Sequence, residues 1–238
     1  MLTLNCPNCG AALPADAVHS DMATCQYCGT TFRVSDTSAP EPDMGNLILG
    51  ADFSRKPIPG WSFPNEGNVQ LLAGTPPELR CKFPAAKTNY YVLNSSGYFD
   101  DVDASVSLKF YEGEPKYIDA GIIVRHQKGV GSYGVLISPL GTFTVGYYEP
   151  GDDTRMNWKS IMSWSNHSAL RPGLNEANRL RVIVTEHHLR AYINGVLAAS
   201  LPDTRYDLGE VMLAAEPDEK SSIAVGFTDL QVREVVKE

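Results

Sequence analysis

The feature that most constrains this chain is a series of short β-prone stretches that runs from Leu47 onward, with no window of helical 3.6-residue period. Between Val102 and Tyr111, apolar residues alternate strictly with polar ones, which is typical of a strand with one buried face and one wet face. Gly, Pro, Asn and Asp separate the stretches. We therefore predict a mainly β fold, with a two-sheet antiparallel β-sandwich of the jelly-roll type, because a single sheet could not cover so many apolar faces. The clearest predicted strands are Val102–Tyr111, Tyr117–His126, Tyr133–Ser138, Thr142–Tyr148, Leu180–Thr185, Leu189–Ile193, Val211–Ala215 and Ile223–Val235.

Two Cys-x-x-Cys pairs near the N-terminus, Cys6 with Cys9 and Cys25 with Cys28, predict a metal site. Four thiolates complete a tetrahedral zinc site and leave no open coordination position, so the single zinc ion is expected to be structural. Disulfides or a redox pair are the alternative. His19 is a conceivable substitute ligand, but with four cysteines present we expect it in an exposed loop.

The two pairs, with the strand-like segment Thr30–Val34 behind them, resemble the zinc-ribbon family over residues 4–34. This resemblance implies a small zinc ribbon, to which we assign residues 1–34. Residues 35–46 are polar, acidic and proline-bearing, and they are predicted to form an extended linker. The β-sandwich is assigned to residues 47–238.

The formal net charge of −8 argues against nucleic acid as a partner. The predicted ribbon carries only Arg33 as a basic residue, against Asp16 and Asp21, and a phosphate-binding surface needs several cations on one face. The sequence has neither an apolar run long enough for a membrane helix nor the pattern of a signal peptide. Cysteines arranged for metal, with only Cys81 left over as a small buried hydrophobe, predict a cytoplasmic protein.

The C-terminal half carries a second resemblance. Asn178–Val184 is followed by a turn and by Leu189–Val196, in which Asn194-Gly195 favours a type I′ hairpin turn, and Ala224–Val232 closes the run. This succession resembles the concanavalin A-like lectin/glucanase superfamily, in its laminin G-like and keto-disaccharide-hydrolase-like branch, over residues 47–238. The resemblance implies the fold but not the function, because that superfamily contains lectins, glycosidases and interaction modules.

No catalytic residues are predicted. The Glu-x-Asp-x-x-Glu strand motif of laminarinase-type enzymes is absent. The acidic runs 100–103, 149–153 and 216–219 are expected at strand ends or turns, where acidic residues are usually solvated. Calcium is a second candidate ion, since Asp100, Asp101 and Asp103 could form half of a site on the rim of the sandwich. Their interpretation as ordinary turn residues is favoured.

A binding surface would need exposed aromatic and hydrogen-bonding side chains on one face. If Ile122 and Val124 face the core, strand alternation places Arg125 on the opposite surface, and the same argument turns Arg190 and Tyr192 outward. Trp158 and Trp164 are candidates on the same surface, and the alternative for these two tryptophans is that they cover the edge of the core. The candidate ligand-binding residues are Arg125, Tyr148, Arg190, Tyr192, Trp158 and Trp164.

These observations predict a non-catalytic cytosolic binding or scaffolding protein, in which a structural zinc ribbon is joined to a β-sandwich that binds a protein partner. A protein partner is preferred because a cytosolic lectin would meet few free glycans. The alternative function is a carbohydrate-binding or glycoside-cleaving domain.

Overall fold

The computed structural model describes residues 4–5, 12–13, 18–19, 22–27, 31–33, 41–86, 88–150, 156–186, 188–202 and 205–236. The N-terminal strands are β1 (Leu4–Asn5) and β2 (Ala12–Leu13), which pair, and β3 (Val18–His19), β4 (Met22–Thr24) and β5 (Thr31–Arg33), which form a three-stranded sheet. Of the predicted zinc ligands, Cys25 is described and buried. Cys6, Cys9 and Cys28 lie outside the described residues.

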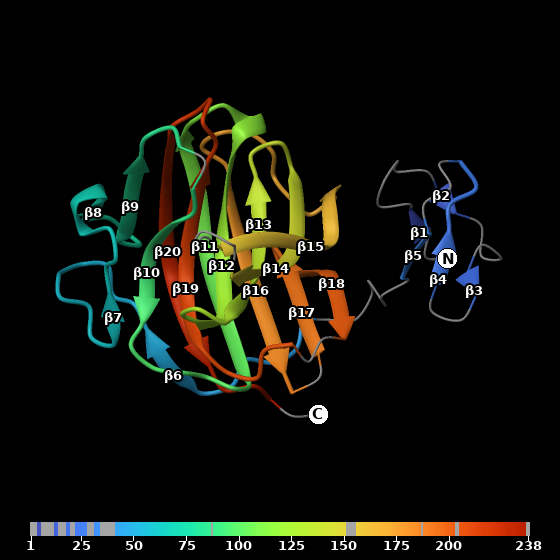
Figure 1. The fold of residues 1–238 in the computed structure, drawn as a ribbon, viewed down its shortest axis with the longest axis horizontal. Helices are drawn as coiled ribbons and strands as arrows, with labels where there is room; N and C mark the ends of the chain where they lie inside the picture. Colours follow the sequence, from blue (N-terminus) through green and yellow to red (C-terminus); the bar gives the residue numbers. More distant parts are fainter. Residues whose placement is uncertain are drawn as a thin grey trace.

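From Leu47 onward the chain forms two antiparallel sheets that make a sandwich, as predicted (Figure 1). One sheet has seven strands, in the order β15 (Met156–Asn166), β14 (Thr142–Pro150), β13 (Gly131–Ser138), β12 (Ile118–Gln127), β19 (Glu210–Pro217), β10 (Tyr90–Ser95) and β7 (Trp61–Ser62). The other has eight strands: β18 (Val196–Pro202), β17 (His188–Ile193), β16 (Ala177–Thr185), β11 (Val102–Glu112), β20 (Ile223–Arg233), β9 (Glu78–Phe83) and β8 (Val69–Leu72), with β6 (Leu47–Gly50) paired to β20.

Helix is confined, in the described part of the chain, to the short 3₁₀ turns η2 (Glu66–Asn68) and η3 (Pro115–Tyr117). Neither is long or apolar enough to cross a membrane.

The main core lies between the two sheets and follows the predicted alternation. In β11, the residues at 102, 104, 106, 108 and 110 are at most 1% exposed and belong to one large apolar cluster. Cys81 on β9 is also buried in this cluster, as predicted, and burial raises the pKa of its thiol. In each sheet, the strand residues that alternate with the inward-facing ones form the outer face of the sandwich.

Each outer face carries its own small apolar cluster. On the seven-stranded sheet, the cluster members are Ile123, Leu136, Tyr148, Met212 and Ala214, with Tyr91 and Trp158 packed against them. On the eight-stranded sheet they are Ile183, Tyr192 and Leu197, with Val235 packed against them. Both outer faces are therefore partly covered instead of being uniformly wet.

The described half of the predicted linker, Glu41–Asn46, lies against the sandwich, and we call it the strap. The side-chain amide of Asn46 donates to the Glu234 carboxylate at 2.7 Å, and the Glu234 backbone N–H donates to the Asn46 carbonyl at 2.9 Å. This part of the predicted linker is thus anchored to the chain that follows β20.

The turn between β17 and β18 has the conformation predicted from its sequence. Asn194 and Gly195 have φ values of 50° and 82°, and a type I′ turn requires a positive φ at both central positions. The Asn194 side chain also accepts a hydrogen bond from the Arg179 backbone N–H at 2.8 Å and donates to the Ala169 carbonyl at 2.7 Å. The turn therefore ties neighbouring loops to the end of the eight-stranded sheet.

Candidate functional site

Arg125 is not an exposed ligand-binding residue. The register of β12 shifts between Val124 and Gln127, and Arg125 itself has a φ of 53°, so a bulge breaks the alternation on which the prediction depended. Its guanidinium is 1% exposed and donates to the Asp100 carbonyl, at 2.9 and 2.8 Å, and to the Tyr206 carbonyl at 2.7 Å. Arg125 thus joins two loops from inside the protein.

The other predicted ligand residues do not share one surface. Tyr192 and Arg190 lie on β17 of the eight-stranded sheet, where Tyr192 is buried at 3% exposure and Arg190 is half-buried. Tyr148 and Trp158 belong to the seven-stranded sheet. Trp164, also on that sheet, is 43% exposed, and the register of the β14–β15 pair shifts between it and Trp158. The prediction of a single outward face is therefore wrong.

The predicted calcium residues are not arranged as a metal site. Asp103 is buried and accepts two hydrogen bonds from the Arg181 guanidinium, at 2.8 and 2.7 Å. Asp100 instead contributes its backbone carbonyl to Arg125, and the Asp101 carboxylate lies 3.9 Å from that guanidinium. Within the described ranges, no group of three or more His, Cys, Asp or Glu side chains could hold a metal ion.

The structure does bring Tyr148 and Trp158 together, on the outer face of the seven-stranded sheet. Their ring centroids are 4.8 Å apart. The indole lies over two glycines on neighbouring strands: a Cβ atom at Gly134 would come within 2.9 Å of it, and one at Gly146 within 2.6 Å. Larger residues at these positions would push the indole off the sheet. Trp158 is partly exposed, whereas Tyr148 beneath it is buried.

Two carboxylates lie on the same face. Asp119 on β12 and Glu216 on β19 are directly paired across neighbouring strands, and both are partly exposed. The Tyr148 hydroxyl donates a short hydrogen bond to Glu216. Glu216 lies near the end of β19, and a strand end or turn was the position expected for it. The expectation that it would be simply solvated is wrong, because it is partly buried and accepts the Tyr148 hydrogen bond, and the carboxylate pair was not expected.

The surroundings of the pair favour protonated carboxyl groups. Burial raises the pKa of Glu216 to about 7, although the hydrogen bond from Tyr148 acts in the opposite direction. Burial, together with the charge of Glu216, raises the pKa of Asp119 well above its usual value. Burial and the same charge raise the pKa of Tyr91 to about 12. Near neutral pH the pair is therefore protonated in a substantial fraction of the molecules, as is common for closely spaced carboxyl groups.

Unpartnered polar atoms also gather on this face. In the described part of the chain, four buried side-chain polar atoms have no hydrogen-bond partner, and strand register places all four on the outer side of the seven-stranded sheet. They are Asn94 Oδ1, Asp119 Oδ1, His126 Nδ1 and Ser132 Oγ. His126 also packs against Tyr91, with ring centroids 5.3 Å apart, and burial lowers the pKa of its imidazole. Buried polar atoms are normally paired with protein groups or with ordered water, so these four atoms each call for a partner that the protein itself does not supply.

The candidate site therefore has an apolar floor and a rim of aromatic and acidic side chains. Such an arrangement can accept hydrogen bonds from a hydroxyl-rich ligand and offer an aromatic face for stacking. Sequence reasoning identified Tyr148 and Trp158 but missed Asn94, Asp119 and Glu216. The sequence offered no clear signal for these residues, because an acidic residue between two apolar ones, as in Ile118-Asp119-Ala120, is ordinary at an outward strand position.

No family model and no curated protein matches the sequence. Among solved structures, a family 16 glycoside hydrolase from Bacteroides ovatus, in complex with a mixed-linkage glucan product, is 9% identical with a TM-score of 0.58, covering 78% of this chain and 100% of its own. A β-glucanase from Bacillus licheniformis is 10% identical, with a TM-score of 0.54 and coverage of 79% and 98%. A Bacillus subtilis protein of unknown function with a galectin-like fold is 10% identical, with a TM-score of 0.56 and coverage of 82% and 99%.

At these identities the likeness concerns the fold alone. The region from Leu47 onward shares its β-sandwich fold with these glucanases and with the galectin-like protein.

Proposed function

We propose that the protein binds saccharides on the outer face of its seven-stranded sheet. The observation that carries this proposal is the partly exposed carboxyl pair, Asp119 and Glu216, on the same face as the partly exposed Trp158. Four polar atoms without a protein partner lie on that face as well. A saccharide supplies many hydroxyl groups, which can donate to the partly exposed carboxyl groups of Asp119 and Glu216. Its C–H faces pack on aromatic rings such as that of Trp158. The structural neighbours that act on glucans share the fold and support this choice of ligand class.

The test is a glycan array on the full-length protein, followed by calorimetric titration of the best glycan. Trp158→Ala should weaken binding at least tenfold, because stacking contacts form only in the complex. Asp119→Asn keeps the shape of the rim and should weaken binding by a smaller factor. Trp164→Ala is the matched control, since it removes an exposed tryptophan from the same strand outside the cluster, and it should bind normally.

An array without any bound glycan would contradict the proposal, as would equal losses in the Trp158 and Trp164 variants. If the protein binds no glycan on the array, and if its binding to a purified protein partner is lost in Trp158→Ala, the protein-binding function predicted from the sequence is the better description.

Glycoside cleavage is a second candidate function, and the carboxyl pair favours it. A carboxyl group whose pKa lies near 7 can act as a general acid beside a second carboxylate. Reducing-end release from the glycan bound on the array, abolished in Glu216→Gln while binding persists, would assign hydrolysis. Binding without release would leave a non-catalytic module.

We also propose that residues 1–34 hold one structural zinc ion through Cys6, Cys9, Cys25 and Cys28, and that the protein works in the reducing cytoplasm. The sequence spacing supports this, together with the buried position of Cys25 next to β4.

A further inference from the structure

Three arginines of the eight-stranded sheet hold the strap on the outer face of that sheet. Arg181 on β16 donates to the carbonyls of Pro42, at 2.7 Å, and Asp43, at 3.2 Å. Arg233 at the end of β20 donates to the Gly45 carbonyl at 2.8 Å. The strap is therefore bound mainly through its backbone.

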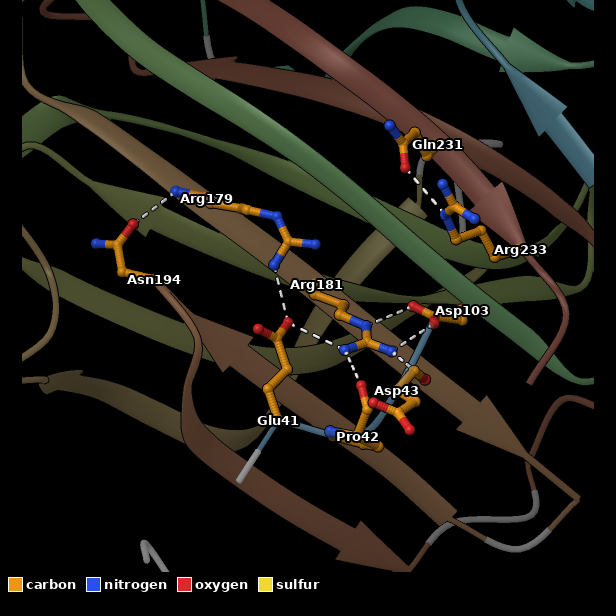
Figure 2. Close-up of polar contacts among 9 residues, drawn as sticks. All are labelled: Glu41, Pro42, Asp43, Asp103, Arg179, Arg181, Asn194, Gln231 and Arg233. Atoms are coloured by element: carbon orange, nitrogen blue, oxygen red, sulfur yellow. Dashed lines mark hydrogen bonds and ion pairs between the residues drawn. The ribbon is translucent and has the colours of Figure 1, made fainter. Parts of the chain in front are cut away.

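Like Asn46 at the other end of the strap, Glu41 is bound through its side chain. One carboxylate oxygen, Oε1, lies 2.8 Å from Arg179 and 3.1 Å from Arg181, and Figure 2 shows it between the two guanidinium groups. Burial alone would raise the pKa of Glu41, but the pairs with both arginines outweigh it and lower the pKa. A carboxylate is thus already bound by this part of the sheet, and it comes from the chain itself.

The two arginines differ in whether another acidic side chain balances their charge. Arg181 is 1% exposed and makes a two-pronged pair with Asp103, so its charge is balanced without Glu41. Arg179 is partly exposed, and its guanidinium has Glu41 as its acidic partner. Removing Glu41 would therefore leave Arg179 as a guanidinium open to another anion.

A shallow pocket, open to solvent, lies next to this guanidinium. Its volume is about 380 Å³, and Glu41 forms part of its wall. Arg171 lies on the same wall, as an exposed second cation, so the pocket carries two arginines against one glutamate. The remaining lining residues are small or neutral polar ones: Ser107, Ala177, Asn178, Asn194 and Gly195.

We propose that this pocket binds small organic carboxylates, and that Glu41 is a built-in competitor for Arg179. The planar guanidinium matches a carboxylate in geometry and charge, and the bound Glu41 side chain demonstrates that match. The site lies on the opposite sheet from the saccharide face and is independent of it. An incoming carboxylate would displace the Glu41 side chain and weaken the hold on the first residues of the strap.

The test is a calorimetric titration of succinate into the full-length protein, at constant ionic strength maintained with sodium chloride. Glu41→Ala should bind succinate at least tenfold more tightly than the unaltered protein, because it removes the competing carboxylate. The double variant Glu41→Ala with Arg179→Gln should lose that gain. Asp43→Ala is the matched control, since it removes an exposed carboxylate from the same strap, and it should bind as the unaltered protein does.

Thermal unfolding without succinate shows whether each variant is folded before titration. Equal affinity of the unaltered protein and Glu41→Ala would overturn the proposal, as would an undiminished gain in the double variant. Inorganic phosphate is titrated in parallel. Binding of phosphate to Glu41→Ala as tight as that of succinate would overturn the assignment to carboxylates.

Discussion

At the scale of single residues, the carboxyl pair is the most informative feature, because it places an acidic group where the core gains nothing from it. A folded-state pKa of about 7 for Glu216 means that folding favours the protonated form. The resulting stability is complete below the unfolded pKa of about 4.5 and is lost as the pH rises through 7. The face is thus maintained at a cost in stability near neutral pH.

Glu216→Gln should therefore stabilise the protein at pH 8 and have little effect at pH 4. The expected gain at pH 8 is roughly 2 kcal/mol, below what the full pKa shift would give, because the side chain is partly exposed. Urea unfolding at the two pH values measures it. Glu66→Gln, on an exposed glutamate paired with Lys56, is the control and should not stabilise the protein at pH 8. An equal gain at both pH values would indicate a packing effect instead of a charge effect.

At the scale of elements, the strap behaves as a short segment held by ion pairs and backbone contacts. The lowered pKa of Glu41 means that its contribution to stability is present above the unfolded value of 4.5 and is lost as the pH falls below it. Protonation of this one side chain would release the carboxylate from both arginines.

Glu41→Gln should lower the free energy of unfolding by about 1 kcal/mol at pH 7, and the difference should shrink towards pH 3. Chemical denaturation of the full-length protein at both pH values measures this. Asp43→Asn, an exposed position on the same strap, should be nearly neutral throughout. A loss for Glu41→Gln that persists undiminished at pH 3 would contradict the ion-pair explanation.

Prediction from the sequence succeeded for features that are local in the chain. The strand at Val102–Glu112 is recognisable because apolar and polar residues alternate along the sequence itself. Arg125 was misplaced because a bulge between Val124 and Gln127 breaks the alternation at Arg125 itself. The pairing of Asp119 with Glu216 depends on β12 lying beside β19, and no local pattern carries that information.

At the scale of the whole molecule, we expect the folding of residues 1–34 to depend on zinc and the folding of the β-sandwich to be independent of it. Cys9→Ser should abolish zinc binding and unfold residues 1–34, since metal binding and folding are one event in a unit this small. The β-sandwich should persist, because its core is formed by its own strands. Elemental analysis and thermal unfolding followed by near-ultraviolet circular dichroism test both statements. A zinc content unchanged from that of the unaltered protein, or loss of the sandwich transition, would contradict them.

The pairing of β6 with β20 brings the first and last strands of the sandwich into contact. The hydrogen bond from Glu234 to Asn46 extends that contact beyond the strands. The chain therefore enters and leaves the sandwich at two points that are about one strand spacing apart. A short loop joining the two ends would keep every strand pairing while the chain is opened at a surface turn, so the sandwich is suited to circular permutation. For the same reason it could be inserted whole into a loop of a host protein without forcing that loop apart.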